Sequence, residues 1–163
     1  MNDAIFILLM GIGATALMDV WGIIRKPLLG VSSPDYGMVG RWFLYMPRGR
    51  FYHQPIAASA AMKGENIVGW MAHYLIGVLF AALLIVMFGT SWMQQPTIIP
   101  ALLVGVFTIV APFCLMQPGM GAGFAASRTP KPNSARLQSL ITHTVFGFGL
   151  YLSGLMAHFL LMN

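Results

Sequence analysis

The chain has 163 residues, of which 58% are hydrophobic and only 8% are charged. This composition is typical of a membrane protein and excludes an ordinary soluble domain. The formal net charge of +5 comes without a basic soluble domain or an aromatic stacking platform, so we expect no nucleic-acid partner. The single cysteine excludes an intramolecular disulfide.

The first apolar run, residues 4–24, is long enough to cross a bilayer, which takes about 20 helical residues. It contains one aspartate, Asp19, whose insertion at mid-helix costs roughly 2.5–3.5 kcal/mol. The aliphatic and aromatic residues of the run each return roughly 0.3–0.6 kcal/mol, so insertion is still favoured. We expect no signal peptide, because Arg25 and Lys26 follow the run and no positive charge precedes it.

Three further runs can span the membrane, at residues 67–88, 98–117 and 137–161. All nine lysine and arginine residues fall between the first and second spans or between the third and fourth. By the positive-inside rule both basic loops are cytoplasmic, and both termini face outward. The sequence therefore predicts an all-α, four-span transmembrane helical bundle, with residues 1–163 forming a single domain in the lipid bilayer.

The first cytoplasmic loop, residues 25–66, contains a predicted amphipathic helix. Ser33 and Pro34 have the pattern of an N-cap and a first helical position. Apolar residues then recur at helical spacing, at Val39, Trp42, Phe43 and Met46. We expect this short helix to lie in the membrane interface, with a second short helix over residues 55–63. One interpretation is aromatic anchoring with snorkelling arginines. The other is recognition of an anionic lipid headgroup by Arg41, Arg48, Arg50 and His53.

The third span contains Pro112, which should kink it. A glycine-rich turn follows, with glycines at Gly119, Gly121 and Gly123. It follows a membrane span and lacks the full spacing of a dinucleotide-binding loop, so that interpretation has little support. Two others stay open. The turn is either a close-packed connection at the membrane surface, or a backbone cradle for a phosphate or lipid headgroup that is assisted by Arg128, Lys131 and Arg136.

Each span offers a polar side chain on its cytoplasmic side. Asp19 precedes Arg25 by six residues, His73 follows Glu65 by eight, and His143 follows Arg136 by seven. At about 1.5 Å per residue, these side chains lie roughly 9–12 Å from the nearest cytoplasmic charge. Gln117 lies slightly shallower, at the inner end of the third span. The sequence predicts an intramembrane polar site formed by Asp19, His73, His143 and Gln117.

Small residues flank these polar positions, which suits contact between helices better than contact with lipid. Ionisable groups inside a membrane are usually paired inward and mark functional sites. An aspartate bonded to either histidine would handle protons, because histidine titrates near neutral pH. A divalent metal is a weaker alternative, since no metal-binding motif supports it, and we predict neither metal nor other cofactor. The structural alternative is a polar clasp, that is, a set of buried polar contacts that only holds the helices of the bundle together.

Several stretches together carry a resemblance to a known family. They are Gly-Ala-Thr-Ala-Leu-Met-Asp at 13–19, Gly-Arg-Trp at 40–42, Arg-Gly-Arg-Phe-Tyr-His at 48–53, Gly-Trp-Met-Ala-His-Tyr at 69–74, the glycine-rich run at 117–132 and His-Thr-Val-Phe-Gly-Phe-Gly-Leu-Tyr at 143–151. The chain resembles, over nearly its whole length, the bacterial domain-of-unknown-function 2938 family of small multi-span membrane proteins. The resemblance implies an inner-membrane location, and in that membrane the outward-facing termini expected from the positive-inside rule would be periplasmic. It brings no activity, so no catalytic residue is carried over.

We therefore expect a small transport or permease-like module. Four spans alone form only a small pathway, so we also expect self-association into a homo-oligomer. A second hypothesis is a membrane enzyme that acts on lipid headgroups at the cytoplasmic interface. A third is a non-catalytic scaffold subunit. Whether the chain is an enzyme stays open, as do the substrate and the direction of transport.

Overall fold

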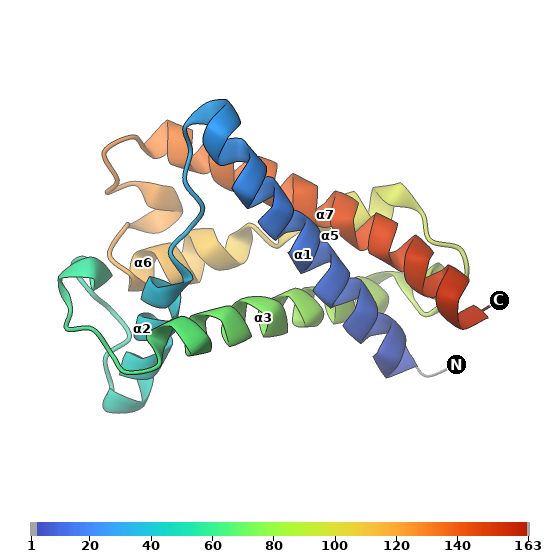
Figure 1. The fold of residues 1–163 in the computed structure, drawn as a ribbon, viewed down its shortest axis with the longest axis horizontal. Coiled ribbons are helices and arrows are strands. Elements are labelled where there is room, and N and C mark those ends of the chain that lie inside the picture. Colours follow the sequence, from blue (N-terminus) through green and yellow to red (C-terminus); the bar gives the residue numbers. More distant parts are fainter. Residues whose placement is uncertain (1–2, 163) are drawn as a thin grey trace. The chain divides into compact units, whose positions relative to one another are not determined.

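The computed structural model describes residues 3–162, and every regular element among them is helical. The predicted all-α fold is therefore confirmed. Four of the helical segments are long and apolar enough to cross a membrane, which indicates a membrane protein. Figure 1 follows the chain from α1 in blue to α7 in red.

The four candidate spans are α1 (Asp3–Leu29), α3 (Glu65–Phe88), the interrupted segment Ile98–Gly119 and α7 (Pro132–Met162). They contain the four apolar runs. The first run was expected to end at residue 24, but α1 continues through Pro27 to its last turn. The reason is that a proline this close to the end of a helix disturbs few of its hydrogen bonds. The longer helix includes Arg25, which the sequence analysis had assigned to the loop.

The third span is irregular near its middle. Helix α5 (Ile98–Phe107) ends in a turn at Thr108, a π-helical segment η3 (Pro112–Met116) follows, and α6 (Gln117–Gly119) completes the span. Pro112 has no N–H to donate to the carbonyl of Thr108, so the regular α-helical pattern cannot continue there. The break predicted at Pro112 is therefore present and begins one turn earlier.

The chain divides into two compact units. Unit 1 consists of Met1–Ser33, Tyr74–Thr108 and Ile141–Asn163, and unit 2 consists of Pro34–His73 and Ile109–Leu140. Unit 2 holds seven basic and two acidic residues, whereas the two basic and two acidic residues of unit 1 balance. The whole formal net charge of +5 therefore resides in unit 2.

Unit 1 has an apolar core in which small residues allow the helices to approach closely. Its largest fully buried side chains include Phe6, Met10, Leu84 and Leu150. A Cβ added to Gly105 would overlap the backbone of Gly147, and one added to Gly149 would press on Ala14. Small residues at every fourth position of the fourth span, Gly149, Ser153 and Ala157, are buried. The short helix α4 (Ser91–Gln94) covers one part of this core with Trp92 and Met93.

Unit 2 contains the predicted short helix α2 (Tyr36–Tyr45), with the 3-10 turns η1 (Met46–Arg48), η2 (Ile56–Ala58) and η4 (Phe124–Ala126). The N-cap of α2 is Asp35, whose carboxylate accepts from the Gly37 N–H at 2.8 Å, so the expected cap at Ser33 was wrong. An aspartate satisfies the first free amides of a helix as well as a serine does. The second short helix expected over 55–63 is only the single turn η2.

Helix α2 packs on the start of α3 through glycines. A Cβ on Gly40 would overlap the carbonyl oxygen of Glu65, and one on Gly69 would overlap that of Tyr36. The two backbones touch here, so this contact fixes which face of α2 is buried. Tyr45 lies on another face of α2 and is only 5% exposed, because its ring packs against His53 and its hydroxyl donates to the Ala60 carbonyl.

The glycine contact predicts that Gly69→Ala destabilises the protein. The added methyl group must displace the backbone of α2, at a cost of about 1–3 kcal/mol. The free energy of unfolding in mixed micelles measures this cost. The control is Met71→Ala on the same helix, because the Met71 side chain is 67% exposed. Equal stability of the Gly69 and Met71 variants would contradict the tight contact.

Candidate functional site

Polar side chains of unit 1 form three hydrogen-bonded contacts between its helices. We call Asp19, Arg25, Tyr74, Thr108, Thr142 and His143 the polar layer. The Tyr74 hydroxyl donates to the Asp19 carboxylate at 3.0 Å, which joins α3 to α1. Both side chains are half-buried in otherwise apolar helices. The hydrogen bond gives the carboxylate a donor, which the surrounding lipid could not provide.

Arg25 joins α1 to α7. Its guanidinium donates to the Thr142 hydroxyl at 3.0 Å and to the Ser32 carbonyl at 3.1 Å, and the residue is only 4% exposed. From its sequence Arg25 is expected in a cytoplasmic loop, where it only marks the depth of Asp19. Its burial instead makes it part of the polar layer, six residues along α1 from Asp19.

His143 joins α7 to the end of α5 through Thr108. The Thr108 hydroxyl donates to the Gly105 carbonyl at 2.6 Å and lies 2.9 Å from His143 Nδ1. A hydroxyl has one proton, so while it donates to Gly105 it must accept from His143. Nδ1 of the neutral imidazole then carries the proton, and Nε2 is the nitrogen that can take up another.

The other two predicted members of the intramembrane site belong to unit 2. The ring of His73 stacks on Tyr36 with centroids 4.1 Å apart and meets the edge of Trp70 at 5.8 Å. Gln117 begins α6, and its side-chain oxygen is buried without a hydrogen-bond partner among residues 3–162. Asp19 and His143 therefore share unit 1, and a joint site with His73 and Gln117 stays a prediction.

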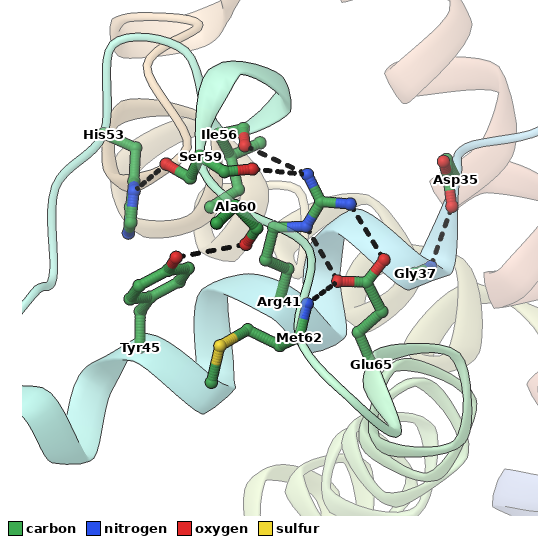
Figure 2. Close-up of polar contacts among 10 residues, drawn as sticks. All are labelled: Asp35, Gly37, Arg41, Tyr45, His53, Ile56, Ser59, Ala60, Met62 and Glu65. Atoms are coloured by element: carbon green, nitrogen blue, oxygen red, sulfur yellow. Dashed lines mark hydrogen bonds and ion pairs between the residues drawn. The ribbon is translucent and has the colours of Figure 1, made fainter.

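In unit 2 the predicted headgroup residue Arg41 is the centre of a network within the chain (Figure 2). Its guanidinium forms a two-pronged ion pair with Glu65, with both N–O distances 2.8 Å, and donates to the Ser59 carbonyl at 3.0 Å. The Glu65 carboxylate also accepts from the Met62 N–H at 2.8 Å. The hydrogen bond with Glu65 raises the pKa of Arg41, which stays charged and tied to the loop.

His53 is part of the same network. It is 6% exposed, and its Nδ1 lies 2.8 Å from the Ser59 hydroxyl, while Tyr45 donates to the Ala60 carbonyl at 3.0 Å (Figure 2). The Tyr45 ring packs against His53 with centroids 5.0 Å apart. Nε2 of His53 is buried without a partner among the described residues. Arg41 and His53 thus hold residues 56–60 against α2, and neither presents its charge or ring to the surface.

The predicted glycine-rich cradle folds back on the chain. The Gly119 carbonyl accepts from the His53 N–H at 2.8 Å, and the amides of Gly121 and Ala122 donate to the carbonyls of Pro118 and Gln117 at 3.0 and 2.8 Å. Gly121 and Gly123 both have a positive φ, of 92° and 76°, which glycine adopts without strain. The amides of Gly121 and Ala122 are engaged within the turn, which favours the close-packed interpretation over the phosphate cradle.

The remaining predicted headgroup residues, Arg48, Arg50 and Arg128, have exposed side chains. The guanidinium carbons of Arg48 and Arg50 lie 5.9 and 5.7 Å from the centroid of the Tyr45 ring. Arg128 donates a hydrogen bond to the Tyr52 hydroxyl. Lys131 and Arg136, which were predicted to assist the glycine-rich turn, are exposed as well, so a headgroup could reach these five basic residues.

Arg25, Tyr74 and Thr108 belong to the polar layer but were not predicted from the sequence. The available signals were weak: Tyr74 is next to His73, and Thr108 lies four residues before Pro112, where a carbonyl must lose its helical partner. Within residues 3–162, no group of three or more histidine, cysteine, aspartate or glutamate side chains is placed to hold a metal ion.

The His143 contact predicts that Thr108→Val destabilises the protein by about 1–3 kcal/mol. Valine has nearly the same shape but leaves the Nδ1–H of His143 without its acceptor in an apolar unit. Unfolding in mixed micelles measures the change. Thr97→Val is the matched control, because Thr97 is exposed and makes no side-chain cap hydrogen bond. Equal effects of the two substitutions would show that the contact contributes little.

The Arg41 network predicts that Arg41→Lys loosens the loop of unit 2. Lysine keeps the charge but cannot form the planar two-pronged pair while also reaching the loop carbonyls. We expect trypsin to cleave after Lys63 about fivefold faster. Arg48→Lys makes the same change at an exposed position and should leave the rate unchanged. An unchanged rate in the Arg41 variant would contradict the role of the network.

Comparison with protein-family models tests the resemblance that the quoted sequence stretches carry. The model of the family called Protein of unknown function (DUF2938) matches residues 8–157, so the predicted resemblance is confirmed. No curated protein and no solved structure matches the chain. Because the family match covers most of the sequence, this chain belongs to the DUF2938 family.

Proposed function

We propose that this protein is a small membrane transport module in which Asp19 binds the transported or coupling proton. The observation that carries the proposal is the polar layer of unit 1, where ionisable side chains on α1 and α7 are hydrogen-bonded inside helices that are otherwise apolar. Ionisable residues at such positions are costly, and they mark proton relays and ion pathways in membrane proteins.

Asp19 is suited to binding a proton. A carboxylate near the middle of a span costs roughly 2.5–3.5 kcal/mol, and protonation removes the charge responsible for this cost. The Tyr74 hydroxyl, 3.0 Å away, donates a hydrogen bond that steadies the charged form. The two forms can therefore interconvert without a large rearrangement of α1 and α3.

His143 is the second proton-binding group that we propose for unit 1. Thr108 holds the imidazole with its proton on Nδ1 and leaves Nε2 as the accepting nitrogen. A carboxylate and an imidazole in the same unit provide two groups that can each hold a proton, which is a useful arrangement for a relay.

We further propose an orientation for the chain in a bacterial inner membrane. The basic residues of unit 2 lie in the two loops that the positive-inside rule assigns to the cytoplasm, so the termini would be periplasmic. Self-association remains part of the proposal, because four spans enclose only a small pathway.

The other two functions receive less support. An enzyme acting on headgroups would need Arg41 and His53 at its site, and both are engaged within unit 2. For a scaffold the polar layer would be a clasp only. A suitable experiment must therefore separate loss of proton binding from loss of structure.

The proposal predicts that Asp19→Asn abolishes proton uptake while the protein stays folded. Asparagine can still accept the hydrogen bond from Tyr74 but cannot take up a proton at physiological pH. The protein is reconstituted in liposomes that contain a pH-sensitive dye, and a potassium diffusion potential, negative inside, drives proton entry. We expect the variant to lose about 90% of the protein-dependent flux, that is, about tenfold.

Two variants serve as controls. Asp3→Asn makes the same change in the first turn of α1, outside the polar layer, and should leave the flux unchanged. Tyr74→Phe removes the hydrogen bond but keeps the carboxylate, so flux should persist with a shifted pH dependence. Wild-type flux no greater than that of protein-free liposomes would sink the proposal. Low abundance of the Asp19→Asn variant, together with normal flux per folded molecule, would favour the clasp.

A further inference from the structure

We propose that Arg48 and Arg50, held beside the ring of Tyr45, form a binding site for the phosphate group of an anionic membrane lipid. The site lies in unit 2 and is separate from the polar layer, so it does not depend on the transport proposal. Three features support it: the chain turns at Gly49, neither arginine is paired with a carboxylate among residues 3–162, and exposed aromatic residues follow.

The turn brings the two arginines to one aromatic ring. Gly49 adopts a φ of 73°, and the amides of Gly49 and Arg50 donate to the carbonyls of Met46 and Tyr45 at 2.9 and 3.2 Å. This is the hydrogen-bond pattern of a Schellman motif, in which a glycine with positive φ reverses the chain. As a result Arg48 and Arg50 reach the same ring from either side of Gly49.

The ring is itself held in place. Tyr45 is 5% exposed, its hydroxyl donates to the Ala60 carbonyl, and its face packs against His53 (Figure 2). The guanidinium carbons of Arg48 and Arg50 lie 5.9 and 5.7 Å from its centroid. A fixed ring therefore orders two flexible side chains before any ligand arrives, which lowers the entropy cost of binding.

The two guanidinium groups repel each other. Both guanidinium carbons lie near one ring centroid, so the distance between them is at most the sum of their two distances to it. This upper limit is close to the Debye length of about 10 Å, over which salt screens charges. Within residues 3–162, neither guanidinium is paired with a carboxylate, whereas Arg41 is paired with Glu65. A phosphate between them would remove the repulsion and accept from both planar forks.

The neighbouring residues favour a lipid as the source of the phosphate. Phe51 is 61% and Tyr52 is 49% exposed, and they directly follow Arg50. The segment is fixed in place, because Trp42 donates to the Phe51 carbonyl at 2.9 Å and Arg128 donates to the Tyr52 hydroxyl. Exposed aromatic rings beside arginines match the headgroup region of a bilayer, where the rings meet acyl chains and the cations meet phosphates.

The test is a binding titration with Arg48→Gln/Arg50→Gln and a charge-matched control. Purified protein in neutral detergent is titrated with short-chain phosphatidylglycerol or phosphatidylcholine, and bound lipid is counted by native mass spectrometry. We expect wild type to prefer phosphatidylglycerol and the double variant to bind it about 10- to 30-fold more weakly. Lys63→Gln/Lys131→Gln removes the same charge from exposed positions of unit 2 and should change the affinity less than about threefold.

Each other outcome would overturn the proposal. An equal loss in both double variants would show unspecific attraction to the basic unit. Both lipids contain a phosphate, but only phosphatidylglycerol has a net negative charge. Equal binding of the two would show that the site does not select an anionic lipid. Full competition by inorganic phosphate at the lipid's own concentration would identify a free anion as the ligand. Arg48→Lys/Arg50→Lys keeps the charge without the planar guanidinium groups and should bind with intermediate affinity. The melting temperatures of the Lys and Gln double variants verify that both are folded.

Discussion

A polar group inside an apolar helix must find its hydrogen-bond partner within the protein, and this constraint organises unit 1. Lipid offers no donor to Asp19 and no acceptor to Arg25, so hydroxyl groups on neighbouring helices supply both. Each such contact joins two helices at a defined level. Close approach is possible because glycines line the contacts, as where Gly105 meets Gly147. The polar layer and the small-residue contacts are therefore two parts of one solution.

Unit 2 meets the same constraint with charge. Its seven basic residues are balanced by only two carboxylates, and Glu65 is used fully by Arg41 and by the Met62 amide. This pair closes the loop onto α2 and buries His53 against Tyr45. The remaining arginines cannot be paired within the unit, so they stay at its surface. The division between structural and exposed arginines follows from the shortage of acids.

The sequence was sufficient to predict the number of spans, because hydropathy over about 20 residues is a strong signal. The depth of Asp19 and His143 stays a prediction, which follows from distance along a helix alone. It could not indicate direction around the helix, because lipid-facing and inward-facing positions are both apolar here. Thr108 and Tyr74 were therefore missed. The burial of Tyr45 could not be predicted either, because His53 and Ala60, which cover it, belong to the loop that follows α2.

A clasp and a proton site can be built from the same hydrogen bonds, and the difference lies in what a proton changes. In the Asp19–Tyr74 contact the phenol donates to the charged carboxylate, whereas a protonated carboxyl can itself donate, so the contact survives protonation with its direction reversed. In the His143–Thr108 contact the donor is fixed by Gly105, so a second proton must enter at Nε2 and leaves the contact intact. Both groups can therefore change charge without separating the helices that they join. A pair with a purely structural role would not need this property.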